Sequence, residues 1–396
     1  MDTTHYTFFA PCPRGLESIL HDELLTLGAV DLFVTPGGVG FSGSLDLCYR
    51  ANLESRIASR ILWRIAQAPY RSEQDVYHVV ADLPWHQWFL PTQTIKVKVS
   101  AQQCPLQSLT FVTLRIKDAV CDRFTTSCVH RPTVDTTRPD ILIVAFLDQH
   151  TVTLYLDTSG DPLFKRGLRQ RTSEAPLREN LAAGILRLSG WQPNQVLFDP
   201  MCGGATLPIE AAMIALDIAP GLGRSFAFEK LQMFERTVWT DLCARSRARQ
   251  RPYGQVPIFA CDRSAKAIQT AQENVAAAGF TDIIRLKQAN LLTIEAPAAT
   301  GILVANPPYG RRMNDDEQMA RFYPLLGDCL KQRYPGWAAY LFTGDLRLPK
   351  LIGLSTSRRI PLFNGAIECR LYQFNLFTGG NRQRESLKTD RTVKAR

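Results

Sequence analysis

Residues 196–206 read VLFDPMCGGAT, and residues 302–313 read ILVANPPYGRRM. Each stretch opens with a short apolar run that is typical of a buried strand, and continues into residues that favour a tight turn. In open α/β sheets, ligands bind outside the carboxyl ends of the strands. The two stretches are therefore predicted to place chemically useful residues at the same edge of one sheet.

The surrounding sequence predicts the rest of that sheet. Apolar runs and helical periodicities alternate at the spacing of βα units, which is typical of a doubly wound, mostly parallel α/β domain, here over residues 181–378. The expected strands are Val196–Phe198, Ile258–Ala260, Ile283–Gln288 and Ile302–Ala305, and the expected helices are Leu181–Leu188, Leu207–Leu216, Ala265–Ala278 and Gln318–Arg333.

The turn at Cys202–Thr206 contains the adjacent glycines Gly203 and Gly204. Glycines let the backbone approach a ligand closely, and the following helix offers free N–H groups at its N-terminus. The alternative is that glycine serves only the sterics of a strand–helix turn. No Lys follows the glycines, so the turn lacks the pattern of a phosphate-binding loop, which disfavours a nucleoside triphosphate.

Asp262 ends the next expected strand, one βα unit after the glycine turn. An acid in this place typically accepts hydrogen bonds from a ribose diol. The alternative is a helix cap, because either Asp262 or Ser264 could cap the helix that begins at Ala265.

The NPPY stretch, Asn306 to Tyr309, favours a planar group that carries an –NH2. Asn306 Oδ1 and the Pro307 carbonyl can accept both amino hydrogens, and Tyr309 can stack on the ring. The alternative is a rigid turn with a buried Tyr.

The last of the six His residues is His150, which excludes a His-based triad in the second half of the chain. Positioning and an activated cofactor must therefore drive the chemistry there. Methyl transfer from a sulfonium meets that condition.

The first 158 residues predict two smaller α+β modules. Residues 1–65 are expected to contain a strand at Tyr6–Ala10, a helix at Gly15–Leu27 and a helical pattern over Leu45–Ile65. Residues 66–158 predict a second module. Its expected strands are Ile95–Val99, Ile141–Asp148 and Thr151–Asp157, with a helix at Leu109–Phe124. Residues 159–180 read as a basic linker, and residues 379–396 as a basic tail that we expect to be disordered.

Composition excludes several classes of protein. The 396 residues are 45% hydrophobic and 21% charged, close to a globular average. No apolar run approaches the roughly 20 residues of a membrane span, and we see no secretory signal, so a cytoplasmic protein without membrane contact is expected. The ten cysteines form no CxxC or zinc-like spacing, which predicts reduced thiols and no metal site.

The net charge of +9 is concentrated in three clusters. Such clusters suit a polyanion such as RNA, although each could also be an ordinary solvated face. One cluster is the tail, where six basic residues oppose two acids between Asn381 and Arg396. The other two are Lys165, Arg166, Arg169 and Arg171, and then Arg245, Arg247, Arg249 and Arg251.

The pairing of DPMCGGAT with NPPYGRRM resembles the class I S-adenosylmethionine-dependent methyltransferases that modify exocyclic or amide nitrogens. APLRENLAA at 175–183 and IEAAM at 209–213 narrow the resemblance to the THUMP-domain guanine-N2 RNA methyltransferases, most closely the RlmL-type 23S rRNA enzymes. It covers nearly the whole chain and includes RGLE at 14–17, KDA at 117–119 and PDI at 139–141.

The resemblance implies a Rossmann-like methyltransferase domain preceded by a ferredoxin-like domain and by a THUMP domain, at residues 66–158, that helps to bind RNA. It implies a cofactor, S-adenosylmethionine, and an RNA partner, with rRNA preferred over tRNA; a monomer is the default expectation. The residues expected to bind the cofactor are Asp199, Pro200, Cys202, Gly203, Gly204, Thr206, Asp262 and Asn290. The residues expected to hold and align the flipped guanine are Asn306, Pro307, Pro308 and Tyr309.

Two residues depart from the family's pattern. The family's turn usually reads DPxCGSGT, whereas this chain has Gly204 and Ala205, and the added methyl of Ala205 is expected to weaken cofactor binding. Asn290 stands where the family commonly has an Asp that accepts from adenine N6. The alternatives left open are a tRNA guanine-N2 methyltransferase, an adenine-N6 or glutamine-N5 methyltransferase, and a non-catalytic RNA-binding ribosome-assembly factor.

Overall fold

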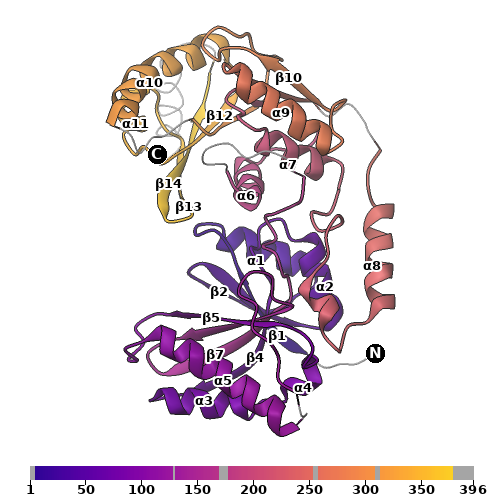
Figure 1. The fold of residues 1–396 in the computed structure, drawn as a ribbon. Helices are drawn as coiled ribbons and strands as arrows, with labels where there is room; N and C mark the ends of the chain where they lie inside the picture. Colours follow the sequence, from indigo (N-terminus) through magenta and orange to yellow (C-terminus); the bar gives the residue numbers. More distant parts are fainter. Residues whose placement is uncertain (1–4, 128–129, 169–176, 253–256, 308–312, 378–396) are drawn as a thin grey trace, which may run out of the picture. The chain divides into compact units, whose positions relative to one another are not determined.

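The computed structural model describes residues 5–127, 130–168, 177–252, 257–307 and 313–377 (Figure 1). The chain divides into two compact units. Unit 1 comprises Met1–Gly167 together with Ile218–Gln250, and unit 2 comprises Leu168–Asp217 together with Arg251–Arg396. Each unit is built around its own seven-stranded sheet.

Unit 1 contains a sheet with the strand order β2-β3-β1-β4-β7-β6-β5. Its strands are β1 (Tyr6–Pro11), β2 (Val30–Thr35), β3 (Gly38–Gly43), β4 (Leu62–Pro69), β5 (Ile95–Ala101), β6 (Ile141–Leu147) and β7 (Thr151–Asp157). Its helices are α1 (Glu17–Thr26), α2 (Leu45–Glu54), α3 (Glu73–Ala81), α4 (Trp85–Trp88), α5 (Leu109–Ser127), the 3-10 helix η1 (Ala227–Lys230) and α8 (Arg236–Ala248).

The predicted helix over Leu45–Ile65 is wrong in its second half. Helix α2 ends at Glu54, and the chain from Leu62 forms the strand β4. The cause is the buried carboxylate of Glu23, which accepts from the Ser55 hydroxyl and from the backbone N–H of Arg56 (3.1 Å) and Ile57 (3.3 Å). These bonds hold the residues after Glu54 in a non-helical path.

Strand β4 also joins the two expected N-terminal modules. It pairs with β1 on one side and with β7 on the other, both antiparallel. Residues 1–65 and 66–158 therefore contribute strands to one continuous sheet.

Unit 2 contains a sheet with the order β10-β9-β8-β11-β12-β14-β13. Its strands are β8 (Leu197–Asp199), β9 (Ile258–Asp262), β10 (Ile284–Gln288), β11 (Ile302–Ala305), β12 (Ala338–Thr343), β13 (Arg358–Asn364) and β14 (Ile367–Asn375). Its helices are α6 (Glu179–Ser189), α7 (Thr206–Ala215), α9 (Ala265–Ala277), α10 (Met313–Arg333) and α11 (Leu348–Leu351).

The first five strands of this order are parallel, which confirms the expected mostly parallel sheet. All residues of β8, and Leu303–Ala305 of β11, are buried, so both faces of the central strands are covered. Strands β13 and β14 form an antiparallel hairpin, and β14 pairs with β12.

The segment Ile218–Gln250, which the sequence places within 181–378, packs in unit 1. Phe228 is buried there and its ring lies 4.6 Å from that of Tyr49 in α2. Helix α8 also packs against α2 (Figure 1). In the ranges that the structure covers, no helix is both long enough and apolar enough to span a membrane.

Candidate active site

The expected site residues follow four neighbouring strands of unit 2 at their carboxyl ends. Asp199 ends β8 and Asp262 ends β9, while Asn290 follows β10 and Asn306 follows β11. The parallel register brings these ends together, because Asp199 pairs with Ala260 and Asp262 pairs with Gln288. The structure thus places these four side chains at one edge of the sheet, where such sheets bind ligands.

The glycine turn between β8 and α7 depends on left-handed backbone angles. Gly203 has φ +52° and Ala205 has φ +65°, and the Ala205 N–H donates to the Cys202 carbonyl (2.8 Å). A Cβ on Gly203 would meet no atom within 4 Å. The space above Gly203 is therefore open, and its glycine is required by conformation and not by crowding.

Asp262 holds this turn. Its Oδ2 accepts from the Gly203 N–H at 3.1 Å, and its Oδ1 accepts from the Ser264 N–H at 2.9 Å. Ser264 caps α9, because its hydroxyl accepts from the Ala267 N–H. The helix-cap role therefore falls to Ser264, and each Asp262 oxygen retains a lone pair for a further donor.

Asn274 is a residue that the sequence reasoning missed. It lies on the buried side of α9 and is 0% exposed, and its Nδ2 donates to the Gly204 carbonyl at 3.0 Å. The available signal was a polar amide in the apolar stripe that Ile268, Ala271 and Val275 define, since a buried polar group requires a partner.

Asp199 is buried against the turn, with 2% of its surface exposed. Its Oδ1 accepts from the Met201 N–H at 3.2 Å. Burial raises the pKa of the Asp199 carboxyl to about 8, and the negative charge of Asp262 adds to the shift. Pro200 is also buried, and its carbonyl accepts from the Cys261 thiol at 3.5 Å.

Cys202 and Thr206 lie at the two ends of the turn. The Cys202 N–H donates to the Cys261 carbonyl of β9 at 3.0 Å, and burial raises the pKa of its thiol far above its ordinary value. Thr206 is the first residue of α7.

Asn290 is exposed, and its Oδ1 accepts from the Leu292 N–H at 3.0 Å. This bond caps the turn after β10. An amide oxygen has two lone pairs, so a second acceptor position is left, and the adenine contact stays a prediction.

Asn306 has an Oδ1 that is buried and has no hydrogen-bond partner among the residues that the structure places. Pro307 is buried directly after it. A buried acceptor without a donor costs about 1–3 kcal/mol. Such a group marks a position where a ligand donor is expected. Pro308 and Tyr309, the other two residues expected to hold the base, lie outside the described residues.

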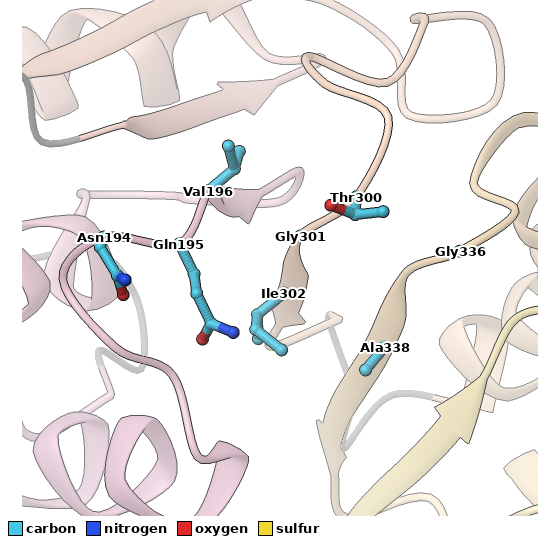
Figure 2. A pocket seen from close by; sticks show the side chains of 8 residues that line it. All are labelled: Asn194, Gln195, Val196, Thr300, Gly301, Ile302, Gly336 and Ala338. Atoms are coloured by element: carbon cyan, nitrogen blue, oxygen red, sulfur yellow. The ribbon is translucent and has the colours of Figure 1, made fainter.

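A pocket of about 370 Å³ lies at the opposite edge of the same sheet (Figure 2). Its lining residues immediately precede or begin β8, β11 and β12, and they include no charged side chain: Asn194, Gln195, Val196, Thr300, Gly301, Ile302, Gly336 and Ala338. Parallel strands place their starts and ends at opposite edges, so this pocket is distinct from the edge that carries Asp199 and Asn306.

The basic clusters are partly structural. Arg166 is 4% exposed and donates to the carbonyls of Leu163 (2.6 Å) and Arg56 (2.8 Å), so its expected place in a phosphate-binding surface is wrong. Arg245 pairs with Asp241, and Arg249 pairs with Glu54 at 2.9 Å. Arg169, Arg171 and the tail lie outside the described residues.

The chain matches three known families in succession. Residues 7–62 match the RlmL ferredoxin-like domain, residues 70–157 the THUMP domain, and residues 166–373 the RMKL-like methyltransferase domain. These matches confirm the predicted domain types and fold class.

Relatives and solved structures agree with these matches. The chain is 37% identical to the Synechocystis protein slr0064, a candidate RNA methyltransferase, over 93% of this chain and 97% of that one. It is 40% identical to the ribosomal RNA large subunit methyltransferase K/L of Syntrophotalea carbinolica, of which it spans 53%.

Among solved structures, SMU.472, a candidate methyltransferase complexed with SAH, covers 96% of this chain with a TM-score of 0.87 and 28% identity. The chain thus spans about half the length of the K/L relatives that it matches, and nearly all of slr0064. On the family matches and these identities, the chain belongs to the RMKL-like methyltransferase family.

Proposed function

We propose that this chain transfers a methyl group from S-adenosylmethionine to the exocyclic N2 of a guanine in 23S rRNA. The family is one of methyltransferases, the curated K/L relatives act on large-subunit ribosomal RNA, and SMU.472 was solved with SAH. S-adenosylmethionine is the cofactor.

The residues at the sheet edge fit this cofactor. The backbone at Gly203 leaves open space, and the Asp262 oxygens retain acceptor positions suited to a ribose diol. Asp199, Cys202, Gly204 and Thr206 would hold the methionine part. When bound, S-adenosylmethionine supplies a methyl group on a sulfonium, which is already a good leaving group.

The chain's own contribution is to hold the nucleobase, and Asn306 carries the argument. Its buried Oδ1 has no donor among the placed residues. A guanine amino group at this position would satisfy the Asn306 oxygen, and the Pro307 carbonyl would accept the second amino hydrogen. These two bonds hold the lone pair of the guanine amino nitrogen in a fixed direction, so positioning supplies most of the rate enhancement. After the methyl transfer, the amino nitrogen can lose its extra proton to water.

Nucleoside mass spectrometry tests the reaction. The purified full-length chain is incubated with S-adenosylmethionine and rRNA or tRNA from cells that lack the gene. N2-methylguanosine in 23S rRNA is the expected product. N6-methyladenosine, or methylation of tRNA alone, would overturn the corresponding part of the proposal. A protein that does not bind S-adenosylmethionine at micromolar concentration would instead be a non-catalytic factor.

Asn306→Ala tests the amino-acceptor role. The methylation rate is expected to fall about 100-fold, the size of effect that a misplaced reacting group causes, while the affinity for S-adenosylmethionine stays within a fewfold of wild type. Asn194→Ala is the matched control, because Asn194 lines the pocket at the opposite edge. Full activity in Asn306→Ala would refute the amino-acceptor role of Asn306. Loss of activity in Asn194→Ala with full activity in Asn306→Ala would move the site to the opposite edge.

A further inference from the structure

The sheet of unit 1 has two unlike faces. One cross-strand row runs through Phe41, Phe8, Trp63, Leu156 and Ile143, whose backbones are partners in the ladder. All five side chains are buried. Because direct partners in a sheet point to the same side, this row defines the face that packs into the core.

The other face presents cations and aromatic rings. A second cross-strand row runs Arg64, Tyr155, Val144, Lys98, with a cation at each end and a ring between them. The next row runs Gln67, Thr153, Phe146, Ser100. Lys98, Gln67 and Ser100 are exposed, the other residues of the two rows are half-buried, and Thr153 alone among the eight is buried. We call these two rows the open face of unit 1.

The two charged side chains of the open face, Arg64 and Lys98, are of one sign. Lys96, beside Leu142 on the same side, adds a third cation, whose ammonium donates to the Thr136 carbonyl at 2.6 Å and also interacts electrostatically with the Asp135 carboxylate. Within the ranges described, none of Arg64, Lys96 and Lys98 is in an ion pair, and Arg64 bonds only the neutral amide of Gln67 (3.3 Å). Asp157, the acid at the end of this side of β7, is buried and paired with Arg60.

Cations interleaved with rings on an open sheet suit single-stranded RNA. Phosphates pair with the cations, and unstacked bases stack on aromatic side chains with about 1–3 kcal/mol each. The Phe9 ring lies 6.2 Å from that of Tyr155 and extends the aromatic part towards β1. A duplex hides its bases from such rings, so it would gain only the phosphate contacts.

We propose that the open face of unit 1 binds a single-stranded segment of the RNA substrate. The inference rests on the proposed function, since it takes RNA as the substrate. Arg64 and Lys98 contact phosphates on either side of a base that stacks on Tyr155.

The charge test uses the full chain and a 23S rRNA fragment at several salt concentrations. Arg64→Gln with Lys98→Gln is expected to weaken binding and to reduce the slope of log K against log salt by about 1.4, at roughly 0.7 per single-strand phosphate contact. Arg71→Gln with Arg131→Gln removes the same charge from two exposed positions of unit 1 that lie outside the open face and outside the three basic clusters, and serves as the control. If the two double variants changed the RNA affinity and the salt slope equally, the proposal would be overturned, because RNA binding would then depend on the net positive charge of unit 1 and not on the open face.

The stacking test is Tyr155→Leu, which keeps an apolar side chain but removes the ring. Binding is expected to weaken about tenfold with an unchanged salt slope, as for the loss of one stacked base. The melting temperature and S-adenosylmethionine affinity of each variant must equal those of wild type. A wild-type chain that neither binds nor methylates the RNA contradicts the proposed function. If the wild type is active but the variants bind RNA as well as the wild type does, the open face does not bind RNA. The face would then be assigned to a protein partner.

Discussion

Gly203 and Ala205 lie in the same turn, and both have left-handed backbone angles. For a residue with a Cβ this conformation costs about 1–2 kcal/mol. Ala205 is 0% exposed, so its methyl recovers about 0.8 kcal/mol by burial, and a glycine there would also lose more chain entropy on folding. The opposing contributions nearly cancel, and the departure from the family's usual glycine costs the fold little.

We therefore expect Ala205→Gly to change the free energy of unfolding by less than about 0.5 kcal/mol. Gly203→Ala is expected to lower it by about 1–2 kcal/mol, because the new methyl meets open space and buries nothing in return. Denaturant titration of both variants measures the difference. A large increase in the free energy of unfolding of Ala205→Gly would mean that Ala205 strains the turn in this chain.

Asp199 predicts a pH dependence of stability. Its pKa of about 8 in the folded chain lies above the ordinary Asp value, so the folded state keeps a proton that the unfolded state releases. This contribution is fully present below about pH 4 and is lost as the pH rises towards 8. Without cofactor, Asp199→Asn should therefore gain stability relative to wild type from pH 5 to 8, by at most about 1.4 kcal/mol per pH unit. A constant difference across that range would show that Asp199 is ionised when folded.

The types of the site residues could be predicted from sequence, but their surroundings could not. The strand-end positions of Asp199, Asp262 and Asn306 follow from the βα pattern. The unpartnered Asn306 oxygen and the contact of Asn274 with Gly204 depend on packing between distant segments. Arg166 illustrates the reverse case. Its charge predicted a position on a phosphate-binding surface, whereas its bonds to two backbone carbonyls hold it in the interior of unit 1.

Among the elements, those with local signals were predictable. The parallel strands are apolar runs, whereas β4 continues a helical pattern in the sequence and forms a strand that pairs with β1 and β7. The hairpin of β13 and β14 had a usable signal that was missed. Asn364 ends β13 and pairs with Ile367, so Gly365 and Ala366 form a two-residue loop, and Gly365 has φ +64°, as expected for a glycine at the first central position of a hairpin turn.

Helix α9 supports the cofactor turn through Asn274, and this contact yields a prediction. Asn274→Asp keeps the size of the side chain but replaces the donor by a carboxylate oxygen that faces the Gly204 carbonyl. Stability should fall by about 1–3 kcal/mol, and KM for S-adenosylmethionine should rise severalfold, with KM for RNA unchanged. Gln269→Ala, on the exposed side of α9, is the control. Equal increases in both KM values would indicate general loosening of unit 2.

At the scale of the whole molecule, the chain order and the spatial order differ. Ile218–Gln250 lies between α7 and β9 in sequence, both of which belong to unit 2, yet it packs in unit 1. The long gap between the expected helix Leu207–Leu216 and the expected strand Ile258–Ala260 marks an insertion in the βα pattern. The pattern does not tell where the insertion packs, because the partners of its aromatic residues lie about 180 residues away, as for Tyr49 and Phe228.

Phe228 tests to which unit this segment belongs energetically. Its ring lies 4.6 Å from Tyr49 and 5.1 Å from both Phe226 and Trp239. Truncation of a buried Phe typically costs about 3–5 kcal/mol. In the full chain, Phe228→Ala should increase hydrogen exchange in α2 and leave α9 and β10 protected. Phe374→Ala, in the core of unit 2, should give the opposite pattern. Phe228 lies within the sequence match to the methyltransferase domain. If Phe228→Ala reduced the protection from hydrogen exchange in α9 and not in α2, the segment Ile218–Gln250 would belong energetically to the methyltransferase domain.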